Sequence, residues 1–324
     1  MEQQSKRKLL YFFAGVLTCA AVFFIYFSYS IFKDSECSSD QSIVIEPNSS
    51  GEDIAQLIVE NKITDNVMLA KAAVGIMGFL GYHMKVGEYL VPRNSSLYVT
   101  IKILTVGKKN IRKITIPEGF SVAQVIDRLN ENEFLTGQIT EIPEEGSLMP
   151  DTYCFCYPTE RQKIINQARQ MMKDFMTKEW PKKSQICNLK TPKEVIILAS
   201  IVEKESFLER ELVASVYLNR LKKNMRLQAD PTVIYGLTKG RPLMRKLLYR
   251  DLKNTENPYN TYRKGGLPPT AIANPGRESI LAVLHPADSD YYFFVFDGNS
   301  RHIFSKNFGD HKQIREKINS NKKK

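Results

Sequence analysis

The sequence predicts a mixed α+β protein with an N-terminal transmembrane helix, a small α/β module and a larger mixed α+β domain. Three observations lead to this prediction. Residues 9–32 contain no charged side chain. From residue 42 onward, short β-branched segments alternate with helices that carry capping residues at their starts. The last third has short elements, Pro/Gly turns and one apolar strand at 291–296.

The uncharged segment is long enough to span a hydrocarbon core with some tilt. Lys6, Arg7 and Lys8 precede it, whereas only Lys33 follows beside an aspartate, so the positive-inside bias places the N-terminus in the cytoplasm. A cleaved signal peptide would have a shorter apolar region ending at a small-residue site. A lipid anchor at Cys19 fits poorly because the apolar run continues past it. We therefore predict a single-pass anchor.

The composition is that of a folded protein of 324 residues: 43% hydrophobic, 10% aromatic and 25% charged. A net charge of +11 favours anionic surroundings, but no nucleic-acid-binding signature accompanies it. The four histidines show no metal-ligand spacing, and no phosphate-binding glycine loop or serine elbow is present. No metal or cofactor is predicted. A disulfide among Cys154, Cys156 and Cys187 stays open.

The small module begins with a strand at 42–45, a turn, and a helix starting at Ser49 or Ser50, capped with the acidic residue three positions on. The same pattern recurs as a strand at 113–116 and a helix that Ser121 caps with Gln124. This is a weak two-copy repeat. The other expected elements are helices at 65–79, 95–105 and 162–178, and a short strand around "GEYLV".

The segment "LASIVEKES" (198–206) ends a helix that Thr191 caps together with Glu194. At about 100° per residue, the polar residues share one arc, expected to face solvent or a partner: Lys193, Ser200, Glu203 and Lys204. Glu205 falls on the apolar side. A carboxyl group held against apolar walls has a raised pKa and can donate a proton near neutral pH. The alternative is that Glu205 is solvated in a frayed last turn.

Asp230 in "LQADPTVIYG" (227–236) is the best candidate for a second carboxylate, although an Asp before Pro is commonly a turn residue that bonds its own backbone. Two further stretches, "NPYNTY" (257–262) and "GLPPTAIANPG" (266–276), combine Tyr rings with amide side chains. Such residues suit sugar binding, because a flat ring stacks on a pyranose and amides bond hydroxyl groups. They are equally consistent with well-packed turns.

In order along the chain, these motifs resemble the endolytic murein transglycosylases, the MltG or YceG-like family. The motifs are "IPEGFSVAQVI" (116–126), "LMPDTY" (148–153), "LASIVEKES" (198–206), "VYLNRLKKNMRLQADPTVIYG" (216–236), "NPYNTY" (257–262), "GLPPTAIANPG" (266–276) and "HIFSKNFGDH" (302–311). The resemblance implies a LysM-like module before the catalytic domain, and it makes Glu205 the catalytic glutamate. The chain departs from the family pattern at Ala229, where a Ser or Thr is usual.

The resemblance also implies the reaction: cleavage of the MurNAc-β-1,4-GlcNAc bond of nascent glycan strands with 1,6-anhydro-MurNAc formation, which terminates strand elongation. Expected partners are peptidoglycan glycan strands, the inner membrane and peptidoglycan synthases. Rival functions are a water-using muramidase and a non-catalytic wall-binding scaffold. The expected substrate-binding residues are Gln228, Asp230, Thr232, Tyr235, Tyr259, Asn260 and Tyr262. The expected boundaries are a cytoplasmic tail 1–8, transmembrane helix 9–32, linker 33–41, LysM-like module 42–106, catalytic domain 107–318 and basic tail 319–324.

Overall fold

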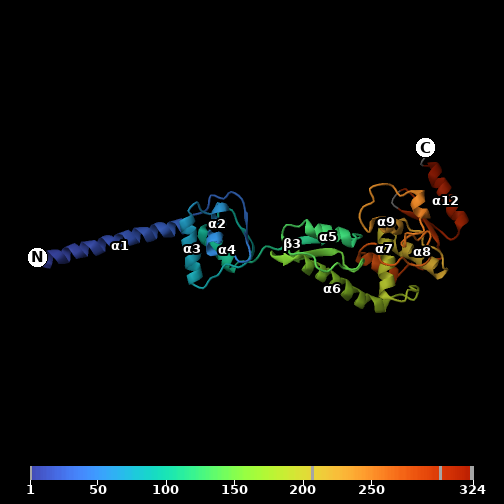
Figure 1. The fold of residues 1–324 in the computed structure, drawn as a ribbon, viewed down its shortest axis with the longest axis horizontal. Helices are drawn as coiled ribbons and strands as arrows, with labels where there is room; N and C mark the ends of the chain where they lie inside the picture. The colour runs from blue at the N-terminus through green and yellow to red at the C-terminus, as the bar shows by residue number, and fades with distance from the viewer. Residues whose placement is uncertain (1, 206–207, 299–300, 322–324) are drawn as a thin grey trace. The chain divides into compact units, whose positions relative to one another are not determined.

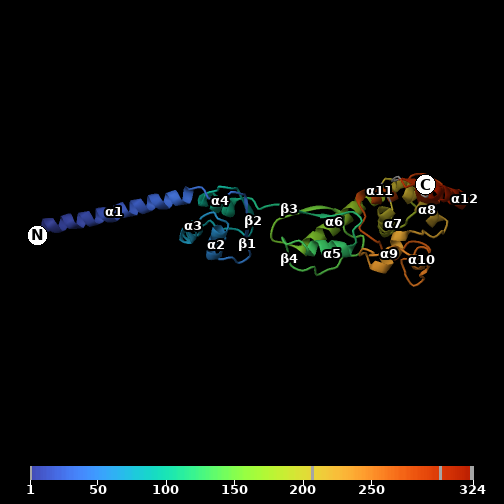
Figure 2. The ribbon, with the colours of Figure 1, turned by 90° about the horizontal axis from the view of Figure 1, so that it is seen from above.

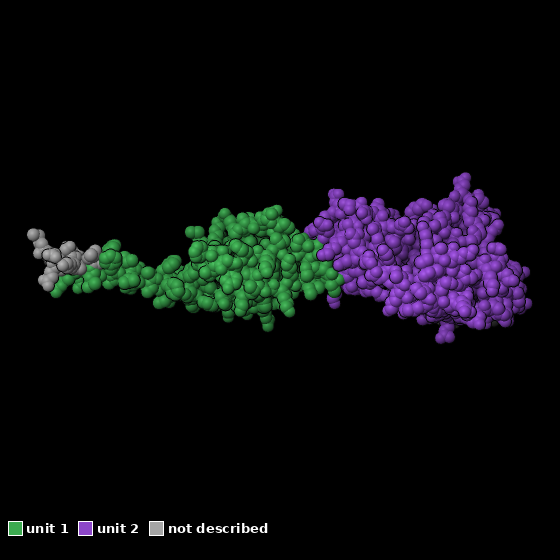
Figure 3. All heavy atoms as spheres, turned by 90° about the horizontal axis from the view of Figure 1, so that it is seen from below, with its two compact units in different colours: residues 1–112, 154–159 green, residues 113–153, 160–324 purple. Residues whose placement is uncertain are grey.

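The computed structural model describes residues 2–205, 208–298 and 301–321. The chain forms two compact units, coloured separately in Figure 3. Unit 1 comprises residues 1–112 and 154–159, and unit 2 comprises residues 113–153 and 160–324. Helices and short two-stranded sheets occur in both units, so the predicted mixed α+β class is confirmed.

The N-terminal helix α1, Glu2–Phe32, is the long blue helix of Figure 1. Its segment Leu10–Phe32 is 23 residues long and apolar enough to cross a membrane. Its side chains are largely exposed, as Phe23, Phe24 and Ile25 illustrate at 68 to 70%. A helix that exposes aromatic and aliphatic side chains on all sides needs an apolar surrounding, which is consistent with a single-pass membrane anchor.

The rest of unit 1 is a strand–helix–helix–strand arrangement followed by a further helix (Figure 2). Ser50 caps the second helix and exchanges hydrogen bonds with Asp53, which confirms the predicted capping box. The two strands pair antiparallel, with Ile43 opposite Tyr89. The elements are β1 Gln41–Ile45, α2 Gly51–Glu60, α3 Val67–Phe79, β2 Gly87–Val91 and α4 Leu97–Val106.

Unit 2 begins with a layer of short strands and two helices. Ser121 and Gln124 form the second predicted capping box at the start of α5. β3 pairs with β5 and β4 with β6. The first residue of β3, the last two of β5 and the first of β6 belong to unit 1. The elements are β3 Arg112–Ile116, α5 Val122–Asn130, β4 Leu135–Thr136, β5 Asp151–Phe155, β6 Thr159–Glu160 and α6 Arg161–Glu179.

The remainder of unit 2 packs helices around one central helix, α7 Pro192–Glu205. Thr191 and Glu194 exchange the predicted capping bonds at its start. α7 packs against α8, α9 and α11, all labelled in Figure 2. The other elements are η1 Trp180–Lys182, α8 Arg210–Lys222, α9 Asp230–Thr238, α10 Tyr249–Lys253, α11 Arg277–Leu284, β7 Phe293–Phe296, β8 His302–Ser305 and α12 Phe308–Asn321.

Four polar residues of α7 were predicted to share a face toward solvent or a partner, and this prediction is wrong for two of them. Lys193 and Lys204 are exposed, but Ser200 and Glu203 are buried at 0% and 3% exposure. Their partners come from far along the chain: the Ser200 hydroxyl accepts a hydrogen bond from the backbone N–H of Ile272. Because α7 is packed on almost every side, its polar residues meet protein groups in place of water. Helical periodicity alone cannot separate those two environments.

Candidate active site

Glu205 is the last residue of α7, and the structure places its carboxyl group in a cavity of unit 2. The side chain is partly buried. Its Oε1 accepts a hydrogen bond from the hydroxyl of Tyr217 over 3.2 Å. Tyr217 is buried in α8, the helix that packs against α7. The residue after Glu205 in the "LASIVEKES" motif, Ser206, lies outside the described residues.

Burial raises the pKa of Glu205 to about 7. The carboxylate loses hydration among protein groups, which disfavours its charged form. The hydrogen bond from Tyr217 and the charge of Arg220 act in the opposite direction, whereas the negative charge of Asp230 raises the pKa further. A carboxyl group with a pKa near 7 is populated both as acid and as base at neutral pH, which suits general acid–base catalysis.

The cavity around Glu205 has a volume of about 380 Å³. Ligand cavities in proteins typically span roughly 300–1,000 Å³. Its polar lining includes Gln228, Asp230 and Tyr262, three of the predicted substrate-binding residues. The remaining lining residues are Tyr217, Arg220, Leu227, Phe293, Phe294, Phe308, His311 and Arg315.

Arg220 fixes one wall of this cavity from α8. Its guanidinium donates to the backbone carbonyls of Tyr292 at 2.7 Å and Leu227 at 2.6 Å, and it lies 5.2 Å from the ring of Phe293. Those bonds hold the segment before Asp230 and the strand β7 against α8. Burial lowers the pKa of Arg220. The side chain therefore joins three parts of the chain beside Glu205 and also contributes positive charge there.

Gln228, Asp230 and Tyr262 line the same cavity as Glu205. Gln228 is exposed and has a φ of 55°, a left-handed backbone conformation that is uncommon for residues other than glycine. Asp230 opens α9, and its Oδ1 accepts a hydrogen bond from the Tyr262 hydroxyl at 2.7 Å. Burial raises the pKa of Tyr262, so the phenol stays protonated and donates to Asp230.

Tyr235 and Tyr259 line a different cavity of unit 2, of about 640 Å³. Their rings meet edge to face at a centroid distance of 4.8 Å. The Tyr235 hydroxyl donates to Oε2 of Glu145 at 3.0 Å, and burial raises the pKa of Glu145. Glu145 carried no signal in the sequence, because a glutamate in a loop is ordinarily a solvated residue.

Thr232 and Asn260 lie in the protein interior at 0% exposure. The Thr232 hydroxyl donates to the carbonyl of Ala229 at 2.7 Å, and its oxygen lies 2.9 Å from the hydroxyl of Thr261. The Asn260 amide donates to backbone carbonyls of the preceding loop, including that of Asn254 at 2.6 Å. Both residues hold the loops that carry Asp230 and Tyr262.

The second glutamate of this helix, Glu203, fastens the end of α7 to α11. Its Oε2 accepts hydrogen bonds from the backbone N–H of Gly276 at 2.9 Å and from the Ser279 hydroxyl at 2.8 Å. Its Oε1 lies 3.6 Å from Nη2 of Arg210, at the start of α8. These contacts fix the last turn of α7 and therefore the position of Glu205 two residues later.

Comparison with known proteins connects this site to a family. The sequence profile of the YceG-like family matches residues 43–317. The chain belongs to the YceG-like family. The match includes the segment that carries Glu205 and the residues around its cavity.

Relatives within this family carry a named activity. A Bacillus subtilis protein named endolytic murein transglycosylase is 31% identical, over 90% of this chain and 87% of its own length. A protein of the same name from Streptococcus pneumoniae is 25% identical over 73% of this chain, which spans about half of that relative (51%). A crystal structure of a yceG-like protein from Listeria monocytogenes, 28% identical, aligns with a TM-score of 0.53 over 86% of this chain and all of that one.

Proposed function

We propose that this YceG-like protein is an endolytic peptidoglycan lytic transglycosylase that cuts the MurNAc-β-1,4-GlcNAc bond of nascent strands and so terminates their elongation. The observation that carries the proposal is the carboxyl group of Glu205, whose pKa is raised to about 7 at a polar cavity. The names of the B. subtilis and S. pneumoniae relatives support it.

Glu205 acts first as an acid and then as a base. Its protonated carboxyl donates a proton to the glycosidic oxygen as the bond from that oxygen to C1 of the muramic acid breaks. The resulting carboxylate takes the proton of the muramic C6 hydroxyl while the C6 oxygen bonds to C1. A 1,6-anhydro end forms, and water is not consumed. The attacking hydroxyl belongs to the same sugar, so its proximity is built in.

Among the predicted substrate-binding residues, Gln228, Asp230 and Tyr262 contact the sugar beside the scissile bond, because they share the cavity with Glu205. The tyrosine pair Tyr235 and Tyr259 offers ring faces and edges for sugars farther along the strand. Thr232 and Asn260 act indirectly, since they are buried and support the loops that carry the contacting residues.

The other parts of the chain hold the catalytic domain at the membrane and at its peptidoglycan substrate. The segment 9–32 anchors the protein once in the bacterial inner membrane, with the tail 1–8 cytoplasmic and everything after residue 32 outside the cytoplasm. Residues 42–106 form a LysM-like module that binds peptidoglycan, residues 33–41 are its linker, and residues 107–318 are catalytic. The tail 319–324 adds basic charge. Peptidoglycan synthases are natural partners, because they supply the nascent strand.

A water-using muramidase is the second candidate, favoured by the presence of Asp230 in the same cavity as Glu205. Glycoside hydrolysis ordinarily needs two carboxyl groups. The two reactions differ by one water in the mass of their products.

The deciding experiment incubates the full-length protein with uncrosslinked glycan strands, wild type beside Glu205→Gln, and reads products by mass. The expected result is fragments one water lighter than hydrolysis products, with the rate about 10²–10⁴-fold lower in the variant. Water-added fragments would establish the muramidase. Strand binding without cleavage by either protein would favour the non-catalytic scaffold.

A further inference from the structure

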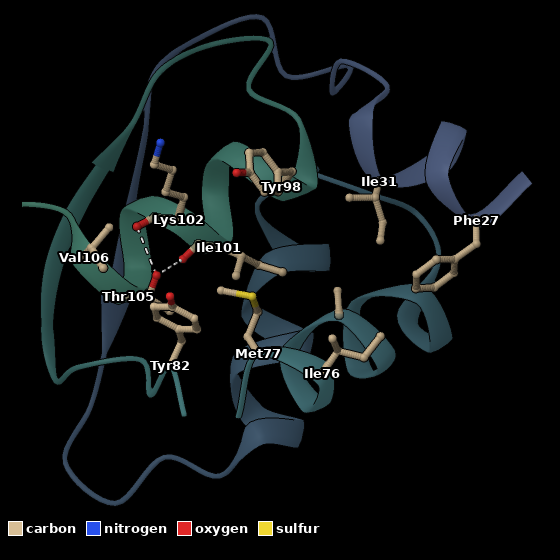
Figure 4. A pocket seen from close by; sticks show the side chains of 11 residues that line it. Phe27, Ile31, Ile76, Met77, Tyr82, Tyr98, Ile101, Lys102, Thr105 and Val106 are labelled. Carbon is tan, nitrogen blue, oxygen red and sulfur yellow. Dashed lines mark hydrogen bonds between the residues drawn. The ribbon is translucent and has the colours of Figure 1, made fainter. Parts of the chain in front are cut away.

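Unit 1 carries an apolar cavity where the end of α1 meets α3 and α4 (Figure 4). Its volume is about 520 Å³. Phe27 and Ile31 of α1 form one side of it, Ile76 and Met77 of α3 another, and Ile101 of α4 a third. The Thr105 hydroxyl in its lining donates back to the carbonyl of Ile101 at 2.9 Å. A cavity with this lining favours an apolar occupant.

The position of α1 sets the depth of this cavity relative to the membrane. The apolar span of α1 ends at Phe32, whose ring lies 5.0 Å from that of Tyr98 in α4. Phe27 is five residues earlier, so it lies about 8 Å deeper along the helix axis at a rise of about 1.5 Å per residue. Side chains packed around Phe27 and Ile31 are therefore at the level of the acyl chains when α1 is inserted.

The surface beside the cavity is also apolar. Phe79 at the end of α3 is 92% exposed and Met68 at its start is 78% exposed. Leu80 and Tyr82, which follow α3, are 59% and 51% exposed. The charged residue of α3, Lys71, is paired with Glu52. Amphipathic elements that lie in a membrane interface bury their apolar face by about 5–10 Å, which matches the depth derived from α1.

We propose that α3 and α4 form a lipid-binding surface, in which Phe79, Leu80 and Tyr82 enter the leaflet from which α1 emerges and a phospholipid acyl chain occupies the cavity. The inference rests on the membrane insertion of α1 proposed above. Tyr82 and Tyr98 place phenol groups beside the apolar side chains, as tyrosines do at membrane interfaces. Lys102, which extends away from the apolar lining in Figure 4, can pair with a lipid phosphate.

The test uses full-length protein in vesicles of phosphatidylethanolamine and phosphatidylglycerol with brominated acyl chains, which quench tryptophan at membrane depth. The chain has one tryptophan, Trp180, and Trp180→Phe removes it. A single tryptophan is then introduced at Phe79. Phe24→Trp in α1 reports insertion of the anchor, and Met244→Trp, a residue of unit 2 that is 93% exposed, is the comparison outside α3 and α4.

We expect quenching of Phe79→Trp to reach at least half of that of Phe24→Trp. Quenching of Phe24→Trp alone would leave the anchor in place and overturn the lipid-binding surface. Absence of quenching at both positions would overturn the anchor and this inference together. For the cavity, a phospholipid with a photoreactive acyl chain should label peptides of α3 and α4 as well as α1. Labelling confined to α1 would contradict the proposal that an acyl chain occupies the cavity. Cross-links between two copies of the chain at Ile76 would also contradict it, because a second copy would then be the occupant.

Discussion

The Tyr217 hydroxyl donates a hydrogen bond to Oε1 of Glu205 from the helix that follows it in the chain. This contact stabilises the carboxylate form of Glu205 and opposes the burial that raises its pKa to about 7. Asp230 acts in the other direction through its negative charge. The alkaline limb of the pH–rate profile should report both effects, because the first step needs protonated Glu205.

Tyr217→Phe should move that alkaline limb to higher pH, by about one unit for the loss of one hydrogen bond to a charged group. In the wild type we expect kcat/KM to fall above about pH 7, following the pKa of Glu205. The measurement is kcat/KM against pH. Tyr153→Phe is the matched control, since the Tyr153 hydroxyl donates to the carbonyl of Met149 elsewhere in unit 2. An unmoved limb in Tyr217→Phe would show that another group controls the profile.

Asp230→Asn should move the same limb to lower pH, because it removes the negative charge that raises the pKa of Glu205. The variant keeps a side chain that can still bond Tyr262. We expect reduced activity and unchanged 1,6-anhydro products. Complete loss of cleavage together with water-added products in the wild type would instead make Asp230 the second carboxylate of a hydrolase.

Glu205→Gln should stabilise the fold at alkaline pH. The folded-state pKa of about 7 exceeds the ordinary value of 4.5, so ionisation of Glu205 costs stability as pH rises between those values. The variant avoids that cost. Its gain in the free energy of unfolding should be near zero at pH 4 and reach about 3 kcal/mol at pH 8. Urea unfolding at both pH values measures it, with the exposed Glu211→Gln as control; equal gains at pH 4 and pH 8 would contradict the assignment.

Gln228→Gly should separate stability from activity. Glycine adopts the φ of 55° observed at Gln228 without steric cost, which favours folding by about 1 kcal/mol. The same change removes the amide that lines the cavity of Glu205, so strand cleavage should weaken. Lys62→Gly is the control, because Lys62 has a φ of 56° in unit 1; it should gain stability with activity retained. Full activity in Gln228→Gly would remove Gln228 from the substrate contacts.

The sequence predicted the local features of this fold well. Capping pairs such as Ser50 with Asp53 and Ser121 with Gln124 depend on residues three positions apart, so their bonds follow from the sequence itself. Glu205 could be singled out because it falls on the apolar side of its helix. Tyr217 and Arg220 could not, since their roles beside Glu205 depend on how α8 packs against α7.

Long-range contacts explain the remaining differences. Glu203 was expected at the surface, but its bonds to Gly276 and Ser279 join segments more than seventy positions apart in the chain, as the sequence separations of 73 and 76 show. For the same reason, some of the predicted sugar-binding residues line cavities and others are buried in the interior. Residues adjacent in sequence, such as Tyr259 and Asn260, lie respectively at a cavity and in the interior.

The two glutamates in the last turn of α7, Glu203 and Glu205, predict different behaviour of their mutant alleles. A change at Glu203 removes the hydrogen bonds that hold α7 against α11, so alleles at this position should be temperature-sensitive. The protein should function in cells grown at low temperature, and it should unfold and be degraded at higher temperature. A change at Glu205 leaves the contacts between α7 and α11 intact. Its alleles should therefore lack activity at every temperature while full-length protein accumulates. Such inert protein would still occupy its substrate, and a Glu205→Gln allele expressed beside the wild type should therefore interfere with it.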